Sequence, residues 1–189
     1  MIPIFFSTIL IDPQSSLLAG TILPLVAMKL IRRDPEKEFR RAVLLGGAWG
    51  LVYGLAVSTM YFTFSDWMFG YMLDTTTFPV PALWPLFIGA NVLMGAAGAA
   101  LSATMVRNGK TWGAALCVAG ALCCLLTVWL PHMDNYQHVG SFAEYRAGTA
   151  AKFPGPAAAQ FGMNLAGGIT AVFSIGLIVW IVRRSLKPA

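Results

Sequence analysis

Charged side chains are scarce in this chain, since Lys, Arg, Asp and Glu make up only 11% of its 189 residues. Soluble domains carry about 25%. A water-soluble fold of this length must cover its surface with solvated groups, and this composition supplies too few of them. Hydrophobic residues reach 57% of the chain. The composition therefore excludes an ordinary soluble domain and indicates an integral membrane protein.

Acidic residues, histidine and arginine are missing from the middle of the apolar runs. These runs have roughly the 17–25 residues needed to cross a hydrocarbon core, and none carries Asp, Glu, His or Arg at mid-length. Ion-coupled carriers and proton pumps normally need such groups at that depth, so both classes are disfavoured. The polar residues that do occur there, among them Asn91, Ser58 and Ser102, are expected to form hydrogen bonds between helices.

Cysteine is rare, with three residues in the chain. Cys117, Cys123 and Cys124 fall in one apolar run and form no Cys-x-x-Cys pair. Neighbouring side chains on a helix point about 100° apart, so Cys123 and Cys124 are poorly placed to bridge. We expect all three thiols to be buried and unpaired.

Five apolar runs predict five membrane-spanning helices and no strand. The runs cover about 15–31, 42–63, 82–106, 111–130 and 160–182, and they leave two longer connections at 64–81 and 131–159. This pattern predicts an all-α, polytopic membrane helix bundle that forms a single domain, 1–189.

The distribution of the basic residues predicts the orientation of this bundle in the membrane. All but two of the 13 Lys and Arg residues lie within or next to 32–41, 107–110 and 183–187. The positive-inside rule places these segments in the cytoplasm. It therefore places the N-terminus outside, the C-terminus inside, and 64–81 and 131–159 as periplasmic loops. An odd number of spans agrees with termini on opposite sides, and we expect a bacterial inner membrane.

The net charge of +5 does not indicate a nucleic-acid partner. The basic residues sit at the ends of apolar runs, and no basic stripe is interleaved with aromatic residues. The expected surroundings are the lipid bilayer and, beyond it, membrane partner subunits or further copies of the chain.

The first eleven residues, MIPIFFSTILI, are apolar and carry no basic residue. Proline disfavours helical geometry in the residue before it and removes a hydrogen-bond donor. Asp12-Pro13 is therefore predicted to interrupt any helix here, leaving a short segment in the outer interface, packed on a neighbour or frayed. Pro24 is predicted to kink the first span.

Small residues recur at four-residue spacing in two spans. Gly46, Gly50 and Gly54 share one helix face in the second span, and Gly162 and Ala166 do so in the fifth. Such faces let helix backbones approach closely in lipid. We expect a tight bundle with the second span at its centre, although the same faces would also suit a homo-oligomer.

Both histidines of the chain lie in 131–153, PHMDNYQHVGSFAEYRAGTAAKF. His132, Asp134, His138 and Glu144 are the candidate catalytic residues, since an imidazole beside a carboxylate can act as a general base. His132, Asp134 and His138 are weak candidates for binding a metal such as zinc, iron or manganese. Alternatively, the charged groups pair with one another and fasten the loop.

We call residues 65–81 and 131–153 the outer cap. Its candidate ligand-binding residues are Tyr136, Tyr145, Arg146, Asp66 and Asp74. Of these, Tyr136, Tyr145 and Arg146 could hold an anionic or hydroxylated head group. The leading hypothesis is that the cap binds a partner protein or an amphipathic ligand, as a subunit or accessory protein of a membrane assembly. The alternatives are an outer-leaflet enzyme with a His/Asp/Glu site and, third, a channel. The sequence identifies no cofactor.

Overall fold

The computed structural model describes residues 4–63, 80–138 and 156–186, and side chains within 13–58, 85–127, 165 and 168–186. The described residues form helices joined by short turns and contain no strand. The helices are α1 (Ile4–Val26), α2 (Met28–Arg33), α3 (Pro35–Thr63), α5 (Val80–Arg107), α6 (Thr111–His138) and α8 (Pro156–Leu186). The all-α prediction is thus confirmed for this part of the chain.

Three of these helices contain stretches long and apolar enough to cross a membrane. The stretches are Pro35–Ser58, Pro85–Arg107 and Gly168–Leu186, and α6 adds a shorter apolar stretch, Thr111–Thr127. The fold, like the composition, is therefore compatible with an integral membrane protein.

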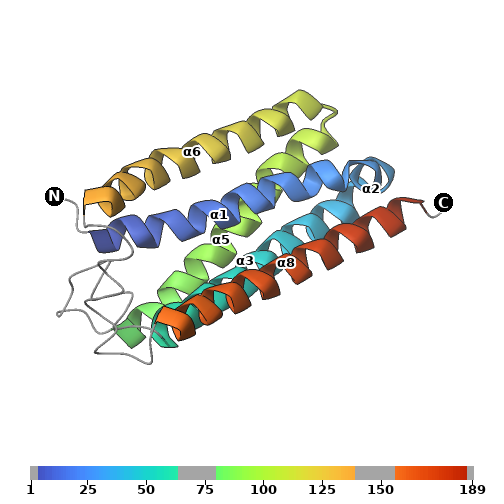
Figure 1. The fold of residues 1–189 in the computed structure, drawn as a ribbon. Helices are drawn as coiled ribbons and strands as arrows, with labels where there is room; N and C mark the ends of the chain where they lie inside the picture. Colours follow the sequence, from blue (N-terminus) through green and yellow to red (C-terminus); the bar gives the residue numbers. More distant parts are fainter. Residues whose placement is uncertain (1–3, 64–79, 139–155, 187–189) are drawn as a thin grey trace.

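The long helices lie lengthwise beside one another (Figure 1). The end of α3, the start of α5, the end of α6 and the start of α8 gather at one end of the bundle. The opposite end holds α2, the start of α3, the α5–α6 turn and the end of α8. We call it the basic end because ten of its residues are Lys or Arg. They are Lys29, Arg32, Arg33, Lys37, Arg40, Arg41, Arg107, Lys110, Arg183 and Arg184.

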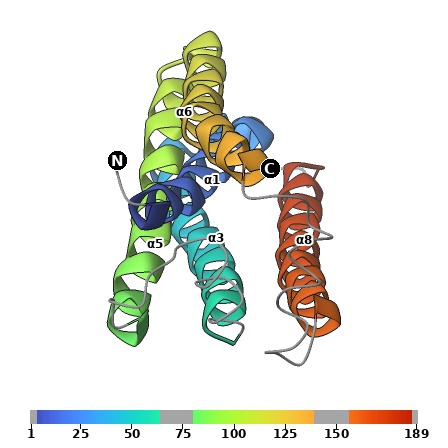
Figure 2. The ribbon, with the colours of Figure 1, turned by 60° about the vertical axis from the view of Figure 1, so that its left-hand side comes forward.

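The buried apolar core lies toward the basic end. It includes Leu30 and Ile31 of α2, Val106 of α5 and Leu177 and Ile181 of α8. α8 packs mainly on α3, and Figure 2 shows it standing away from α5 and α6. Its outward side remains exposed and apolar, as at Val172 and Ile175, which suits a surface that faces lipid.

α3 begins seven residues before the second predicted span because its first turn is capped. The Asp34 carboxylate accepts a hydrogen bond of 3.3 Å from the Lys37 backbone N–H, and Pro35 occupies the first helical position. Glu36 and Glu38 follow in the first turn, where negative charge favours the helix dipole. The charged segment 35–41 is therefore helical and continues straight into the apolar part of α3.

The α5–α6 connection is a tight turn built around Gly109. This residue has φ 73°, in the left-handed region that glycine adopts without a steric penalty. Gly109 N–H donates to the Val106 carbonyl at 3.1 Å and Lys110 N–H donates to the Met105 carbonyl at 2.8 Å. These bonds are those of a Schellman helix end, and they turn α6 back alongside α5.

The predicted interruption at Asp12-Pro13 is wrong. α1 runs without a break from Ile4 to Val26 and contains both Pro13 and Pro24. A proline removes one helical hydrogen bond, whereas ending the helix in an apolar environment would leave several backbone groups unpaired. The helix is instead interrupted at Ala27, three residues after Pro24, where φ is −87° and ψ is 9°.

Glycines bring α1, α3 and α5 into backbone contact around Gly95. A Cβ atom added at Gly46 of α3 or at Gly20 of α1 would clash with the Gly95 carbonyl oxygen. A Cβ added at Gly50 would likewise clash with the Asn91 carbonyl, and at Gly54 it would lie 3.1 Å from the Asn91 Cβ. The Gly46-x-x-x-Gly50-x-x-x-Gly54 face of α3 therefore lies against α5. Gly162 and Ala166 fall outside the residues whose side chains are described.

Asn91 links two of these helices through side chains. It is fully buried, and its Oδ1 accepts a 2.6 Å hydrogen bond from the Ser16 hydroxyl of α1. Its Nδ2 donates to the Phe87 carbonyl at 3.0 Å. The predicted interhelical role of Asn91 is confirmed. The buried hydroxyls of Ser58 and Ser102, by contrast, have no hydrogen-bond partner within the described residues.

The cysteines lie at the surface of α6 and not in the core. All three are free, with Cys123 and Cys124 exposed and Cys117 partly exposed, so the expectation that they are buried is wrong. α6 packs against α1 and α5 along one side only. Its other side faces outward, where a small apolar thiol is compatible with lipid.

The glycine contact predicts which small-residue substitutions are tolerated. Gly50→Ala should lower the free energy of unfolding by about 1–3 kcal/mol, because the added methyl group overpacks the α3–α5 contact. Gly47→Ala is the matched control in the same turn, since its Cβ would meet its nearest atoms at an ordinary 3.7 Å. Unfolding in detergent micelles measures the difference. Equal stability of the two variants would contradict the close approach.

Candidate functional site

Most residues of the predicted outer cap lie outside the described residues. Both the backbone and the side chain lie outside the description for Asp66, Asp74, Glu144, Tyr145 and Arg146. The positions 132, 134, 136 and 138 belong to the last two turns of α6, which continues past Pro131. The side chains of His132, Asp134, Tyr136 and His138 are outside the description.

The helical backbone sets how these positions are arranged. Residues 134 and 138 are separated by one turn and share a helix face, whereas residues 132 and 134 are about 200° apart around the axis. Among the side chains that the structure describes, no three His, Cys, Asp or Glu residues gather to hold a metal ion. The candidates His132, Asp134 and His138 are not among those side chains, so the metal site stays a prediction.

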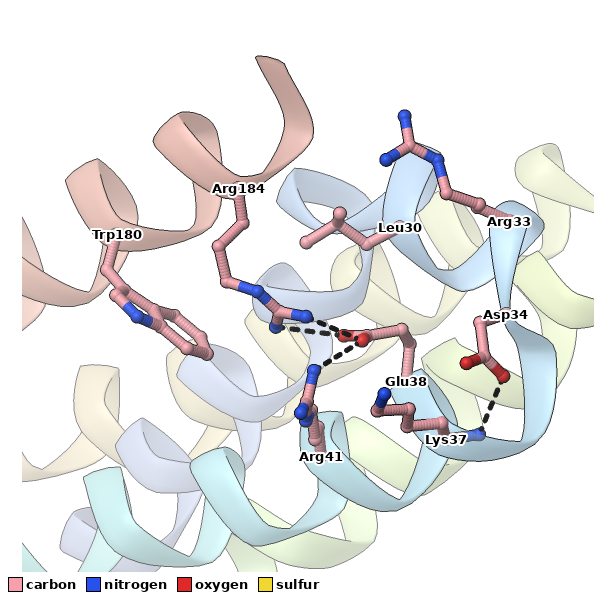
Figure 3. Close-up of a pocket in the computed structure, with 8 residues that line it drawn as sticks. All are labelled: Leu30, Arg33, Asp34, Lys37, Glu38, Arg41, Trp180 and Arg184. Carbon is pink, nitrogen blue, oxygen red and sulfur yellow. Dashed lines mark hydrogen bonds and ion pairs between the residues drawn. The ribbon is translucent and has the colours of Figure 1, made fainter. Parts of the chain in front are cut away.

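The described part of the chain does contain a built polar site, at the basic end. A pocket of about 520 Å³ opens between α2, α3 and α8 (Figure 3). We call it the basic pocket. Its lining combines four cationic, two anionic and two hydrophobic side chains, namely Arg33, Lys37, Arg41, Arg184, Asp34, Glu38, Leu30 and Trp180.

Glu38 is the centre of the ion pairs in this pocket. Its side chain is only 8% exposed. Arg184 of α8 donates to both of its carboxylate oxygens, at 2.8 and 3.2 Å, and Arg41 donates to Oε1 at 2.7 Å. A bidentate arginine–carboxylate pair is among the stronger polar contacts. It connects the start of α3 to the end of α8, 146 residues later.

The buried Glu38 carboxylate is thus shared by two guanidinium groups, that of Arg41 on its own helix and that of Arg184 on α8.

Trp180 forms the wall of the pocket on α8. The Arg184 guanidinium lies over its ring at 4.8 Å from the centroid, a cation–π contact between residues one helical turn apart. The Trp180 side chain is also 43% exposed. A partly exposed tryptophan where an apolar helix becomes basic is typical of a membrane–water interface.

A second hollow adjoins the basic pocket on the other side of α3. It also measures about 520 Å³ and shares Asp34, Lys37 and Arg41 with the first. Glu36, Arg40 and Leu44 complete its lining. Lys37 and Arg41, which are one turn apart, thus line both hollows.

The basic pocket was not predicted from the sequence. Residues 32–41 and 183–187 were predicted only to orient the protein, and the candidate functional residues were those of the outer cap. Two local signals were present: Glu38 and Arg41 have the spacing of a helical ion pair, and Trp180 precedes Arg184 by four residues. The pairing of Glu38 with Arg184 had no local signal, because it depends on how α8 packs.

Compared with models of known protein families, with curated proteins and with solved structures, the chain shows no match.

The ion pairs predict a difference between two neighbouring glutamates. Glu38→Gln should lower the free energy of unfolding by about 1.5–3 kcal/mol, because charged hydrogen bonds to two arginines are lost. Glu36→Gln is the control. The Glu36 side chain is 78% exposed and pairs with Arg107 at 3.2 Å. Glu36→Gln should therefore lower the free energy of unfolding by less than about 1 kcal/mol. Chemical unfolding in micelles measures both, and equal costs would contradict a stabilising role for Glu38.

Proposed function

We propose that this chain is a five-span subunit or accessory protein of a membrane assembly, and that its outer cap binds a partner protein or an amphipathic ligand. In this proposal the N-terminus is outside and the C-terminus is in the cytoplasm of a bacterial inner membrane. α1 and α6 supply the two spans beyond the three that are long and apolar enough within the described residues.

The observation that carries the proposal is the separation of the two ends of the bundle. The helix ends that lead into and out of residues 64–79 and 139–155 gather at one end (Figure 1). The basic clusters of α2, α3, the α5–α6 turn and α8 gather at the other end. This arrangement supports a topology in which both segments of the cap serve one surface, on the side away from the cytoplasm.

A binding role suits the chemistry better than transport. The side chains described inside the bundle provide buried amides and hydroxyls, such as Asn91, Ser16 and Ser102, and these are uncharged. The charged side chains that the structure describes lie at the basic end. Proton or ion coupling usually needs charged groups at mid-membrane depth, whereas recognition at a polar surface does not.

The second candidate is an outer-leaflet enzyme. It is favoured by the extension of α6 to His138, which places residues 134 and 138 one turn apart on one helix face. A carboxylate and an imidazole at that spacing would suit a general base oriented by its neighbour.

The topology has a direct test. A variant with Cys117, Cys123 and Cys124 replaced by Ala and Gly140→Cys introduced should react with a membrane-impermeant maleimide in intact cells. A second variant with Asn108→Cys at the basic end should react only after the cells are opened. Labelling of the two variants in the reverse order would place the outer cap on the cytoplasmic side and contradict the proposal.

The binding role is tested by substitutions in the cap. Native mass spectrometry of gently purified protein should show a bound partner chain or ligand. Substituting Ala for His132, Asp134, His138 or Glu144 should remove most of the bound partner or ligand. Membrane insertion and extraction into detergent should remain normal. Lys110→Gln at the basic end is the matched control and should leave binding unchanged. Full retention in all four alanine variants, or no bound mass on the unaltered chain, would contradict the role of the cap.

A further inference from the structure

We propose that the basic pocket binds the phosphate head group of an anionic phospholipid, held between α3 and α8 by Lys37 and Arg41. This site is independent of the outer cap, because it is built from other residues and lies at the opposite end of the bundle from residues 131–138 of α6.

The excess of cationic side chains in the basic pocket suits an anionic ligand. Lys37, Arg41 and Arg184 surround a single carboxylate, that of Glu38 (Figure 3). Glu38 is already shared by the two arginines. Asp34, the other acidic residue of the lining, uses its Oδ1 as the acceptor for the Lys37 backbone N–H. Cationic side chains thus outnumber the anionic ones, and a phosphate group would compensate for the excess.

The geometry of α3 presents two of these cations together. Lys37 and Arg41 are one helical turn apart and line both hollows, so a phosphate placed between them would contact each. Arg41 donates one N–H to Glu38, and its guanidinium has further donors. The bidentate pair with Glu38 holds the Arg184 guanidinium in place as the far wall.

The surroundings favour a lipid as the source of the phosphate. Hydrophobic side chains lie near the cations on both helices. Trp180, which lines the basic pocket on α8, is 43% exposed, and Leu44, which lines the second hollow on α3, is 72% exposed. Leu44 follows Arg41 by three residues, at the point where α3 becomes apolar. A phospholipid would satisfy the cations with its head group and these surfaces with its acyl chains. Basic pockets between helices at a membrane surface bind lipid head groups in this way.

The test uses the full chain in nanodiscs that contain equal parts of phosphatidylglycerol and phosphatidylcholine. After gentle extraction, native mass spectrometry should show phosphatidylglycerol retained in excess over phosphatidylcholine. Lys37→Gln should reduce this retention about fivefold, the effect expected for one lysine at a lipid phosphate. Lys37→Arg should restore it. Lys110→Gln is the matched control, since it removes a lysine from the same end that lines neither hollow.

Three results would overturn the assignment. The first is equal retention of the two lipids by the unaltered chain, and the second is equal loss in Lys37→Gln and Lys110→Gln. The third concerns free phosphate. If inorganic phosphate in phosphatidylcholine nanodiscs raises the unfolding temperature as much as phosphatidylglycerol does, the pocket binds the ion and not a lipid. Unfolding temperatures of the variants show that each is folded.

Discussion

The close approach of three helices at Gly95 is the constraint on which the rest of the bundle depends. α1 reaches this residue with Gly20 and α3 reaches it with Gly46, so both helices approach the backbone of α5 at the same level. In lipid no hydrophobic force drives helices together, and association relies on van der Waals contact and hydrogen bonds. The glycines allow that contact, and the Ser16–Asn91 bond between α1 and α5 adds the polar component. The directions of α3 and α5 follow from this junction, and so do the positions of their charged ends.

α8 does not take part in this junction, and its attachment has a different physical basis. Its apolar contacts lie near the basic end, at Leu177 and Ile181. Its polar contacts to α3 include the 2.9 Å hydrogen bond from Trp49 Nε1 to the Ser174 hydroxyl and the Arg184–Glu38 ion pair. A hydrogen bond in an apolar environment resists exchange with solvent, and the arginine pair fixes the helix end. α8 is therefore the helix whose position depends most on polar contacts, and the basic end is where that dependence concentrates.

The parts of the fold that were predictable from sequence are those with a local cause. Apolar runs located the long helices, and the four-residue glycine spacing pointed to the α3 face that meets α5. Expectations based on a single local rule were less secure. Pro13 did not end α1, because a buried helix loses less by keeping a proline than by breaking. The charged segment before Ala42 is helical because Asp34 and Pro35 start a helix there. The Glu38–Arg184 pair joins residues far apart in sequence, and only the packing of α8 reveals it. The outer-cap residues form no spacing motif that defines a site, so sequence alone did not determine their role.

The charges of the basic end have a structural role and, in our proposal, a binding role as well. Two arginines share the Glu38 carboxylate, and this arrangement fastens α8 to α3 but leaves positive charge uncompensated. Four cationic and two anionic side chains line the pocket. Two further acidic residues would neutralise that charge, and they would also remove the reason for an anion to bind. A basic cluster that served only to orient the protein in the membrane would not need a pocket, a bidentate ion pair or a tryptophan over the arginine. These features support the proposal that an anionic lipid completes the ion pair between α3 and α8.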